Sequence, residues 1–210
     1  MGCLLLLLRQ AGLAFLANPK TASQAIIAML KPHGERPELA RGTPHMNSRT
    51  FANRLVPYLL VEYGQTFETV AVMREPLARL HSWFRYRQRD ALIGKPNSTH
   101  GMTFDAFVAA SLSDPTPPFA SVGRQDRFLG FLGGGPPVTH IFDHAHLDLL
   151  VDFLSDRLGE PLDLTHRNIS PGATEPPALP PDIAARYAQA HHDEIVLYAR
   201  VADQGHLITR

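Results

Sequence analysis

Two short stretches of this 210-residue chain carry residues that could hold anionic groups. The first reads Pro-Lys-Thr-Ala-Ser-Gln and covers residues 19–24. It lies between a short apolar segment, 13–17, and a segment of helical composition that ends before Pro32. A loop that enters a helix offers unpaired backbone N–H groups at the positive end of the helix dipole, and both features favour an anion.

The side chains of this loop add to its affinity for anions. Lys20 contributes a positive charge on a flexible stem, and Thr21 and Ser23 contribute hydroxyl donors. The stretch is not a Walker loop, because the G-x-x-x-x-G-K-[ST] spacing is missing. The alternative interpretation is a plain capped turn with a surface lysine, and the loop taken alone does not separate the two.

The second stretch begins at Arg74, directly after the apolar segment 69–73. Pro76 fits the first turn of a helix, and Ser82 lies eight residues after Arg74, about two turns along that helix. A guanidinium at a strand end and a hydroxyl on the facing helix can hold one phosphate from two sides. The alternative is an exposed basic helix, because further arginines follow at Arg79, Arg85, Arg87 and Arg89.

The elements that position these stretches follow from the apolar pattern. Three apolar segments, 13–17, 69–73 and 138–142, predict buried strands. Helical segments are predicted at 22–31, 48–63, 76–89, 103–112, 124–131, 145–158 and 181–201. Strands separated by helices predict an α/β fold with three layers, α/β/α, around a central parallel sheet. We expect one domain, 1–210, with its ligand beyond the carboxyl ends of the strands, where Lys20 and Arg74 fall.

Composition narrows the range of partners. The formal net charge is zero, which argues against a nucleic-acid partner. The single cysteine, Cys3, allows no intrachain disulfide and no thiolate zinc site. His140, His144 and His146 gather around the end of the third predicted strand, but no cysteine or paired carboxylate completes a metal site there. We therefore expect no metal.

The apolar run Leu4–Leu8 is too short to span a bilayer. It lacks the basic leading segment and the cleavage site of a secretory signal. We expect it to form a fraying or partly packed first strand, and we expect the protein to be cytoplasmic. The alternatives are a peripheral membrane association through this run and a misplaced start codon.

Taken together and in this order, the two stretches resemble the sulfotransferases that use 3′-phosphoadenosine 5′-phosphosulfate (PAPS). The resemblance is closest to their carbohydrate-type branch, in which the first loop typically reads Pro-Lys-Thr-Ala/Gly-Ser/Gly-Thr/Ser and the second motif reads Val-Arg-Asp-Pro…Arg-Leu…Ser. It implies a P-loop NTPase-like sulfotransferase fold. One departure is Gln24, which stands where the family usually has a Thr or Ser hydroxyl on the 5′ phosphate.

The resemblance also implies roles for individual residues. Lys20 and the loop around it would hold the 5′-phosphosulfate of PAPS, and Lys20 would help to neutralise the departing phosphate. Arg74 and Ser82 would bind the 3′-phosphate. The residues implied in binding PAPS are Pro19, Lys20, Thr21, Ala22, Ser23, Gln24, Arg74 and Ser82. Weaker matches follow at Gln125, at 139–143, at Asn168 and at 193–198.

Transfer of a sulfuryl group to an alcohol needs a base for the hydroxyl proton. His45, in the loop 42–47, is the leading candidate, and Glu62, His33 and Glu35 are lesser ones. PAPS is expected as co-substrate, and the acceptor as a hydroxyl-bearing small molecule or saccharide. The alternatives are a non-catalytic PAP- or nucleotide-binding protein of the same fold and a nucleotide kinase-like phosphotransferase. The sequence carries no signal for an oligomeric state.

Overall fold

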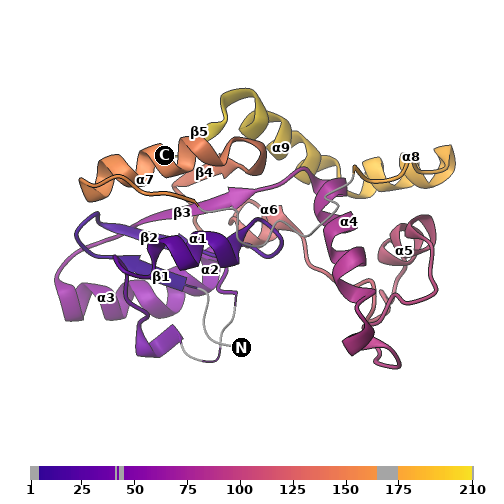
Figure 1. Cartoon of the computed structure of the whole chain (residues 1–210), viewed down its shortest axis with the longest axis horizontal. Coiled ribbons are helices and arrows are strands. Elements are labelled where there is room, and N and C mark those ends of the chain that lie inside the picture. Colours follow the sequence, from indigo (N-terminus) through magenta and orange to yellow (C-terminus); the bar gives the residue numbers. More distant parts are fainter. Residues whose placement is uncertain (1–4, 41, 43–44, 165–174, 210) are drawn as a thin grey trace.

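The structure is a computed structural model that describes residues 5–40, 42, 45–164 and 175–209. It is an α/β protein built around an open five-stranded mixed sheet (Figure 1). The strands lie side by side in the order of the chain. They are β1 (Leu5–Leu8), β2 (Leu13–Leu16), β3 (Glu68–Met73), β4 (His140–Asp143) and β5 (His206–Ile208).

The three strands predicted from apolar segments form the centre of the sheet. β2 pairs with β3, and β3 pairs with β4, both in parallel, as predicted. The prediction of a wholly parallel sheet is wrong at both edges, because β1 and β5 are antiparallel to their neighbours. The short turn that joins β1 to β2, which includes Gly12 at φ 65°, makes this pair an antiparallel hairpin. β5 has no such turn from β4: it follows Gly205 at φ 67°, directly after the helix that ends at Gln204.

The predicted first strand is present as β1, but it is neither frayed nor partly packed. All four of its side chains are buried. Leu5 and Leu7 pack on one face of the sheet, and Leu6 and Leu8 pack on the other, because alternate side chains of a strand point to opposite faces. Leu4 lies outside the described residues. Within the described part of the chain, none of the helices combines the length and apolar character needed to cross a membrane.

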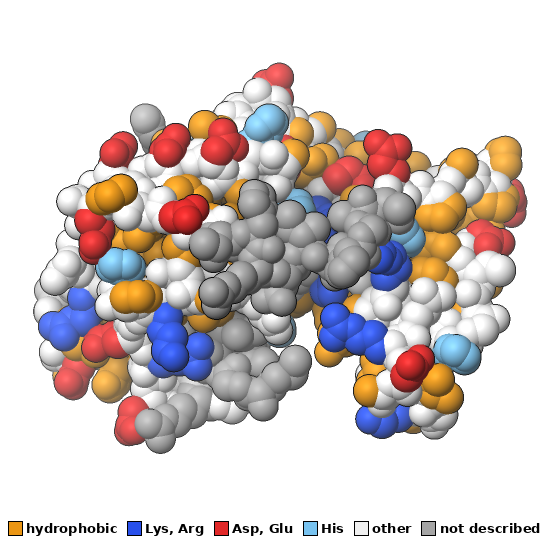
Figure 2. All heavy atoms as spheres, in the orientation of Figure 1, with side chains coloured by type: hydrophobic (Ala, Val, Ile, Leu, Met, Phe, Trp, Pro, Cys, Tyr) orange, Lys and Arg blue, Asp and Glu red, His pale blue; other side chains and the backbone are white. Residues whose placement is uncertain are grey.

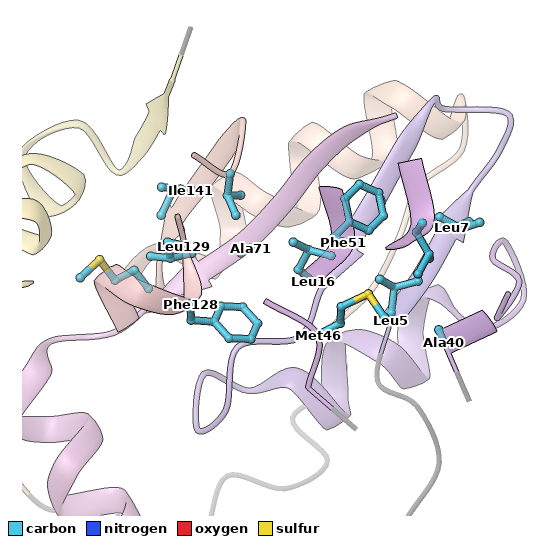
Figure 3. Packing of buried hydrophobic residues seen from close by; sticks show 14 of the residues in the cluster. Leu5, Leu7, Leu16, Ala40, Met46, Phe51, Ala71, Phe128, Leu129 and Ile141 are labelled. Carbon is cyan, nitrogen blue, oxygen red and sulfur yellow. The ribbon is translucent and has the colours of Figure 1, made fainter. Parts of the chain in front are cut away.

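Helices cover both faces of the sheet, as predicted. On one face lie α1 (Ser23–Leu30) and α7 (Leu147–Leu158). The other face packs against the helical segment 48–63 and against α6 (Gln125–Phe128) and α9 (His192–Gln204). The segment 48–63 comprises α2 (Ser48–Thr50), a π-helical turn (Phe51–Leu55) and α3 (Val56–Tyr63). Figure 3 shows Phe51, Met46 and Phe128 packed against strand residues on this second face.

A third apolar cluster lies beyond the carboxyl end of β3. There α4 (Pro76–Arg87) packs with α5 (Phe104–Ser111) and α8 (Pro181–Ala190), and Figure 1 shows these helices together at one side of the sheet. The segment predicted as one helix, 181–201, forms two helices, α8 and α9. They pack against different parts of the protein: α8 packs on α5, whereas α9 packs on the sheet. Short 3₁₀ turns lie at Glu38–Ala40, Asp90–Leu92 and His144–His146.

Candidate functional site

The loop that connects β2 to α1 turns tightly. Lys20 and Ala22 have φ values of 68° and 58°, in the left-handed region that residues with a Cβ rarely adopt. The hydroxyls of Thr21 and Ser23 donate to the carbonyl oxygen of Asn18 at 2.8 and 2.5 Å. Both hydroxyls therefore stabilise the turn of the loop, so neither serves only to bind a ligand.

The backbone N–H groups of this loop point to an anion site. Among the residues that the structure describes, none accepts a hydrogen bond from the N–H groups of residues 20–24. These groups precede or begin α1, which has no side-chain cap. Left-handed residues in a turn are typical of the concave amide arrangements that bind anions, and the helix dipole adds to the effect.

The ammonium group of Lys20 lies against two aromatic rings of α4. Its Nζ is 4.5 Å from the centre of the Tyr86 ring and 5.7 Å from that of Trp83. Burial, together with the positive charges of Arg89 and Arg74, lowers the pKa of Lys20 to about 8. At pH 7 the ammonium is still largely protonated, but it is held among other cations.

Arg74 lies at the end of β3, beside the same loop. Its Nη1 is 3.5 Å from the carbonyl oxygen of Lys20. Burial lowers the pKa of its guanidinium, and Glu75 opposes this effect. The carboxylate of Glu75 caps α4 by accepting from the backbone N–H groups of Leu77 and Ala78. The two stretches singled out in the sequence thus meet beyond the carboxyl ends of the central strands β2 and β3.

Ser82 and Gln24 are less closely associated with this cluster. Ser82 is half-buried on α4, six residues after Pro76, which corresponds to about 9 Å along the helix. No hydrogen bond joins Ser82 to Arg74. Gln24 is exposed on the first turn of α1. Both side chains lie on elements that border the loop, but within the described part of the chain neither forms a hydrogen bond with Lys20 or Arg74.

Arg79 holds the loop through hydrogen bonds to backbone carbonyl oxygens. Its buried guanidinium donates from Nε to the carbonyl oxygen of Pro19 at 3.0 Å and from Nη1 to that of Gly123 at 3.0 Å. Burial lowers the pKa of Arg79 to about 10, with Glu194 opposing the shift, so the group stays charged at neutral pH. Arg79 therefore ties the loop to the segment that precedes α6, a role that its place in the motif did not indicate.

Gln125 connects the ends of β2 and β3. Its Oε1 accepts from Asn18 Nδ2 and from the backbone N–H of Arg74, each at 3.1 Å. Its own backbone N–H donates to the buried carboxylate of Glu194 at 2.8 Å. Burial would raise the pKa of Glu194, but hydrogen bonds from His191 and Gln125 outweigh it, so the pKa is lowered. The sequence marked Gln125 and the stretch 193–198 only as weak family matches, and it placed Asn18 at the start of the predicted phosphate loop without indicating that these residues contact one another.

His45, the predicted base, lies beside the end of β2. Its Nδ1 is 2.7 Å from the carbonyl oxygen of Ala17, so Nδ1 carries the proton and donates it. Burial lowers the pKa of His45, and this outweighs the opposing effect of the Ala17 hydrogen bond. The neutral ring therefore presents an unprotonated Nε2. Its loop neighbours Thr43 and Pro44 lie outside the described residues.

The lesser base candidates lie far from the loop. Glu35 exchanges backbone hydrogen bonds with Leu7, near the amino end of β2. His33 follows the carboxyl end of α1, and Glu62 is exposed near the end of α3. All three lie toward the amino ends of the parallel strands, opposite to Lys20. Asn168 lies outside the described residues.

The predicted histidine cluster is divided between two ends of the sheet. His140 begins β4, and its Nδ1 lies 3.0 Å from His206 Nε2. His144 follows the carboxyl end of β4, where burial and the charge of Arg74 lower its pKa to about 4. In the described ranges, no group of three His, Cys, Asp or Glu side chains is arranged to hold a metal ion.

Basic side chains border an open notch on one face of the molecule (Figure 2). Figure 2 shows a hollow between the α4–α5 side of the molecule and the rest, with Lys and Arg side chains along it. A cavity of about 220 Å³ lies elsewhere, lined by apolar side chains such as Phe131 and by the charged Asp126, Asp193 and Arg200, and it does not include the loop. We locate the candidate site at the loop, because cations and backbone amides converge there.

Comparison of the chain with protein-family models, with curated proteins and with solved structures finds no match.

Proposed function

We propose that this chain is a sulfotransferase that transfers a sulfuryl group from PAPS to a hydroxyl acceptor. One observation carries the proposal: the backbone amides of the 19–24 loop, the Lys20 ammonium and the Arg74 guanidinium meet beyond the carboxyl ends of β2 and β3. This is where open α/β sheets bind their ligands. The proposal includes a P-loop NTPase-like sulfotransferase fold, with which the parallel centre of the sheet is compatible.

The charge balance of the site favours a ligand with more than one phosphate. Four arginines act on Lys20, and all of them lower its pKa: Arg89, Arg74, Arg79 and Arg85. Like charges in a partly buried site repel each other, and an anion among them removes that repulsion. PAPS carries anionic groups at both its 3′ and 5′ positions, so it matches a site with cations on two sides.

Each residue would have a distinct role. The loop amides and Lys20 would hold the 5′-phosphosulfate, whereas Arg74 would hold the 3′-phosphate. Ser82 would join Arg74 on that phosphate if the ligand lies between the end of β3 and α4. Gln24, exposed at the first turn of α1, would offer an amide N–H in place of a hydroxyl.

The transfer itself would use His45. The acceptor oxygen attacks the sulfur, the bond between sulfur and the 5′-phosphate oxygen breaks, and the acceptor proton passes to His45 Nε2. The products are a sulfate ester and adenosine 3′,5′-bisphosphate (PAP). Lys20 and the loop amides would stabilise the negative charge that develops on the leaving phosphate, as preorganised donors do in other group transfers.

Calorimetric titration with PAP tests the binding part of the proposal. We expect PAP to bind more tightly than ADP, and we expect Lys20→Ala and Arg74→Ala each to weaken PAP binding about tenfold or more. Arg54→Ala is a matched control, because Arg54 is exposed on the helical segment 48–63. Unchanged affinity in the two site variants, or no binding by the wild type, contradicts the proposal.

Transfer of labelled sulfate from PAPS to a cell extract, followed by mass spectrometry, tests the reaction. A labelled product that requires Lys20 and His45 supports the sulfotransferase. PAP binding without any product points instead to a non-catalytic binding protein. Magnesium-dependent ATP turnover points to a phosphotransferase.

A further inference from the structure

Lys20 belongs to a stack of cations and aromatic rings on α4. Trp83 and Tyr86 are three residues apart, so they share one face of the helix, and their rings meet edge to face at 5.9 Å. The Lys20 ammonium contacts both rings. Arg89 lies 4.4 Å from the Tyr86 ring, and Arg87 lies 5.0 Å from the Trp83 ring. Each ring therefore interacts with Lys20 and with one arginine that follows it by three or four residues in the chain.

The backbone of Lys20 is fixed independently of these rings. Its left-handed φ sets the direction of the side chain. The carbonyl of the preceding Pro19 accepts from Arg79, and the carbonyl of Lys20 lies beside Arg74. Only the far end of the Lys20 side chain remains to be positioned, and the rings of Tyr86 and Trp83 are the groups that it meets.

We propose that Tyr86, assisted by Trp83, is a positioning residue that holds the Lys20 ammonium beside the loop and yields it to a phosphate of the bound nucleotide. The attraction between a cation and an aromatic ring offsets the repulsion from the neighbouring arginines. A charged phosphate offers Lys20 a stronger, charge-assisted partner. The second half of this inference rests on the proposed function, but the first half does not require a nucleotide.

The chain offers an internal reporter, because Trp83 is its only tryptophan. A positive charge close to an indole ring alters its emission, so Trp83 fluorescence should follow the charge of Lys20. Between pH 6.5 and 9.5, without any ligand, we expect a step in emission near pH 8, where Lys20 loses its proton. Lys20→Met keeps the stem without the charge and should abolish the step. Lys31→Met, at an exposed position, should retain it.

Absence of the step in the wild type, or its persistence in Lys20→Met, overturns the positioning role. A thermal melt of each variant shows that the fold is retained.

Coupling between Tyr86 and Lys20 provides a second test that a merely structural role would not satisfy. Because the cation–π contact is made in the free protein and given up on binding, we expect Tyr86→Leu to strengthen PAP binding by up to about fivefold, the size of one such contact, and Tyr86→Phe to stay within about twofold because its ring remains. In a Lys20→Met background, Tyr86→Leu should have no further effect. Equal effects of Tyr86→Leu in both backgrounds overturn the inference.

The two tests separate this inference from the proposed function. A Lys20-dependent step in a protein that binds no PAP supports the holding role and contradicts the proposed function. PAP binding without such a step contradicts the holding role alone. When both are present, PAP should shift the Trp83 emission of the wild type in the same direction as Lys20→Met does, because the ammonium leaves the rings.

Discussion

The side chain of Gln125 satisfies both backbone groups of Arg74: its Oε1 accepts from the N–H at 3.1 Å and its Nε2 donates to the carbonyl at 2.8 Å. A side-chain amide thus continues the hydrogen bonding of the sheet past the end of β3. Because Gln125 is fully buried, water does not readily take over its hydrogen bonds, and losing them costs stability.

Replacement of Gln125 by alanine should therefore be strongly destabilising. We expect Gln125→Ala to lower the free energy of unfolding by about 2–4 kcal/mol, since it removes a fully buried side chain and leaves partly buried backbone groups of Arg74 without partners. Urea denaturation measures this change. Gln189→Ala, at an exposed position of α8, should change stability by less than about 0.5 kcal/mol. A loss of similar size in both variants would show that Gln125 has no special role.

The left-handed conformation of Ala22 predicts an unusual gain from glycine. Glycine adopts φ values near 58° without steric cost, so Ala22→Gly should raise the free energy of unfolding or leave it unchanged, within about 1 kcal/mol. Ala28→Gly, on the exposed face within α1, should lower it by about 1 kcal/mol. Thermal or urea unfolding compares the two variants, and a clear loss in Ala22→Gly would contradict the described loop.

Donor affinity should fall at alkaline pH. The pKa of Lys20, about 8, means that its charge is present at pH 7 and largely lost by pH 9. We expect PAP to bind several-fold more weakly at pH 9 than at pH 7, and we expect Lys20→Arg to remove most of this difference because a guanidinium stays protonated. Calorimetric titration at the two pH values checks it. An equal pH effect in Lys20→Arg would assign the titration to another group.

Acid should destabilise the far edge of the sheet, where β4 meets β5. Burial, together with the nearby His140, lowers the pKa of His206 to about 4. Burial also lowers the pKa of His140, although Glu68 opposes the shift. The unfolded chain then binds more protons than the folded one below pH 6.5, so stability is lost as the pH falls from about 6.5 toward 4.

The variant His206→Phe tests this assignment. Phenylalanine keeps the stacking that His206 makes on Phe142, whose ring centre lies 3.9 Å away, but it does not titrate. We expect the melting temperature of the wild type to drop more between pH 7.5 and 5 than that of the variant. An unchanged pH dependence would show that other groups cause the acid sensitivity.

The sequence predicted the centre of the fold better than its edges, and the reason is local. Each central strand is an apolar segment next to a predicted helix, so its pattern alone identifies it. β5 has three residues, only one of them buried, and so lacks any such pattern. Similarly, the complete burial of β1 depends on a hairpin with β2 and on helices that cover both faces, which a run of leucines does not specify.

Some contacts of the candidate site could likewise be predicted from the sequence, and others could not. Lys20 and Arg74 were predictable neighbours, because parallel strands bring their carboxyl ends to one edge. The contacts of Gln125 with Asn18 and Arg74 join positions 107 and 51 residues apart, so no local spacing reveals them. The same holds for Arg79 and the carbonyl of Pro19, which are 60 residues apart.

One connection has a consequence for the order in which the site can form. Glu194, on α9, accepts the backbone N–H of Gln125, and Gln125 in turn bonds Asn18 and Arg74. The 19–24 loop therefore depends on a helix that is synthesised long after it. A nascent chain can pair β2 with β3 early, but the candidate site is complete only once α9 has emerged and docked.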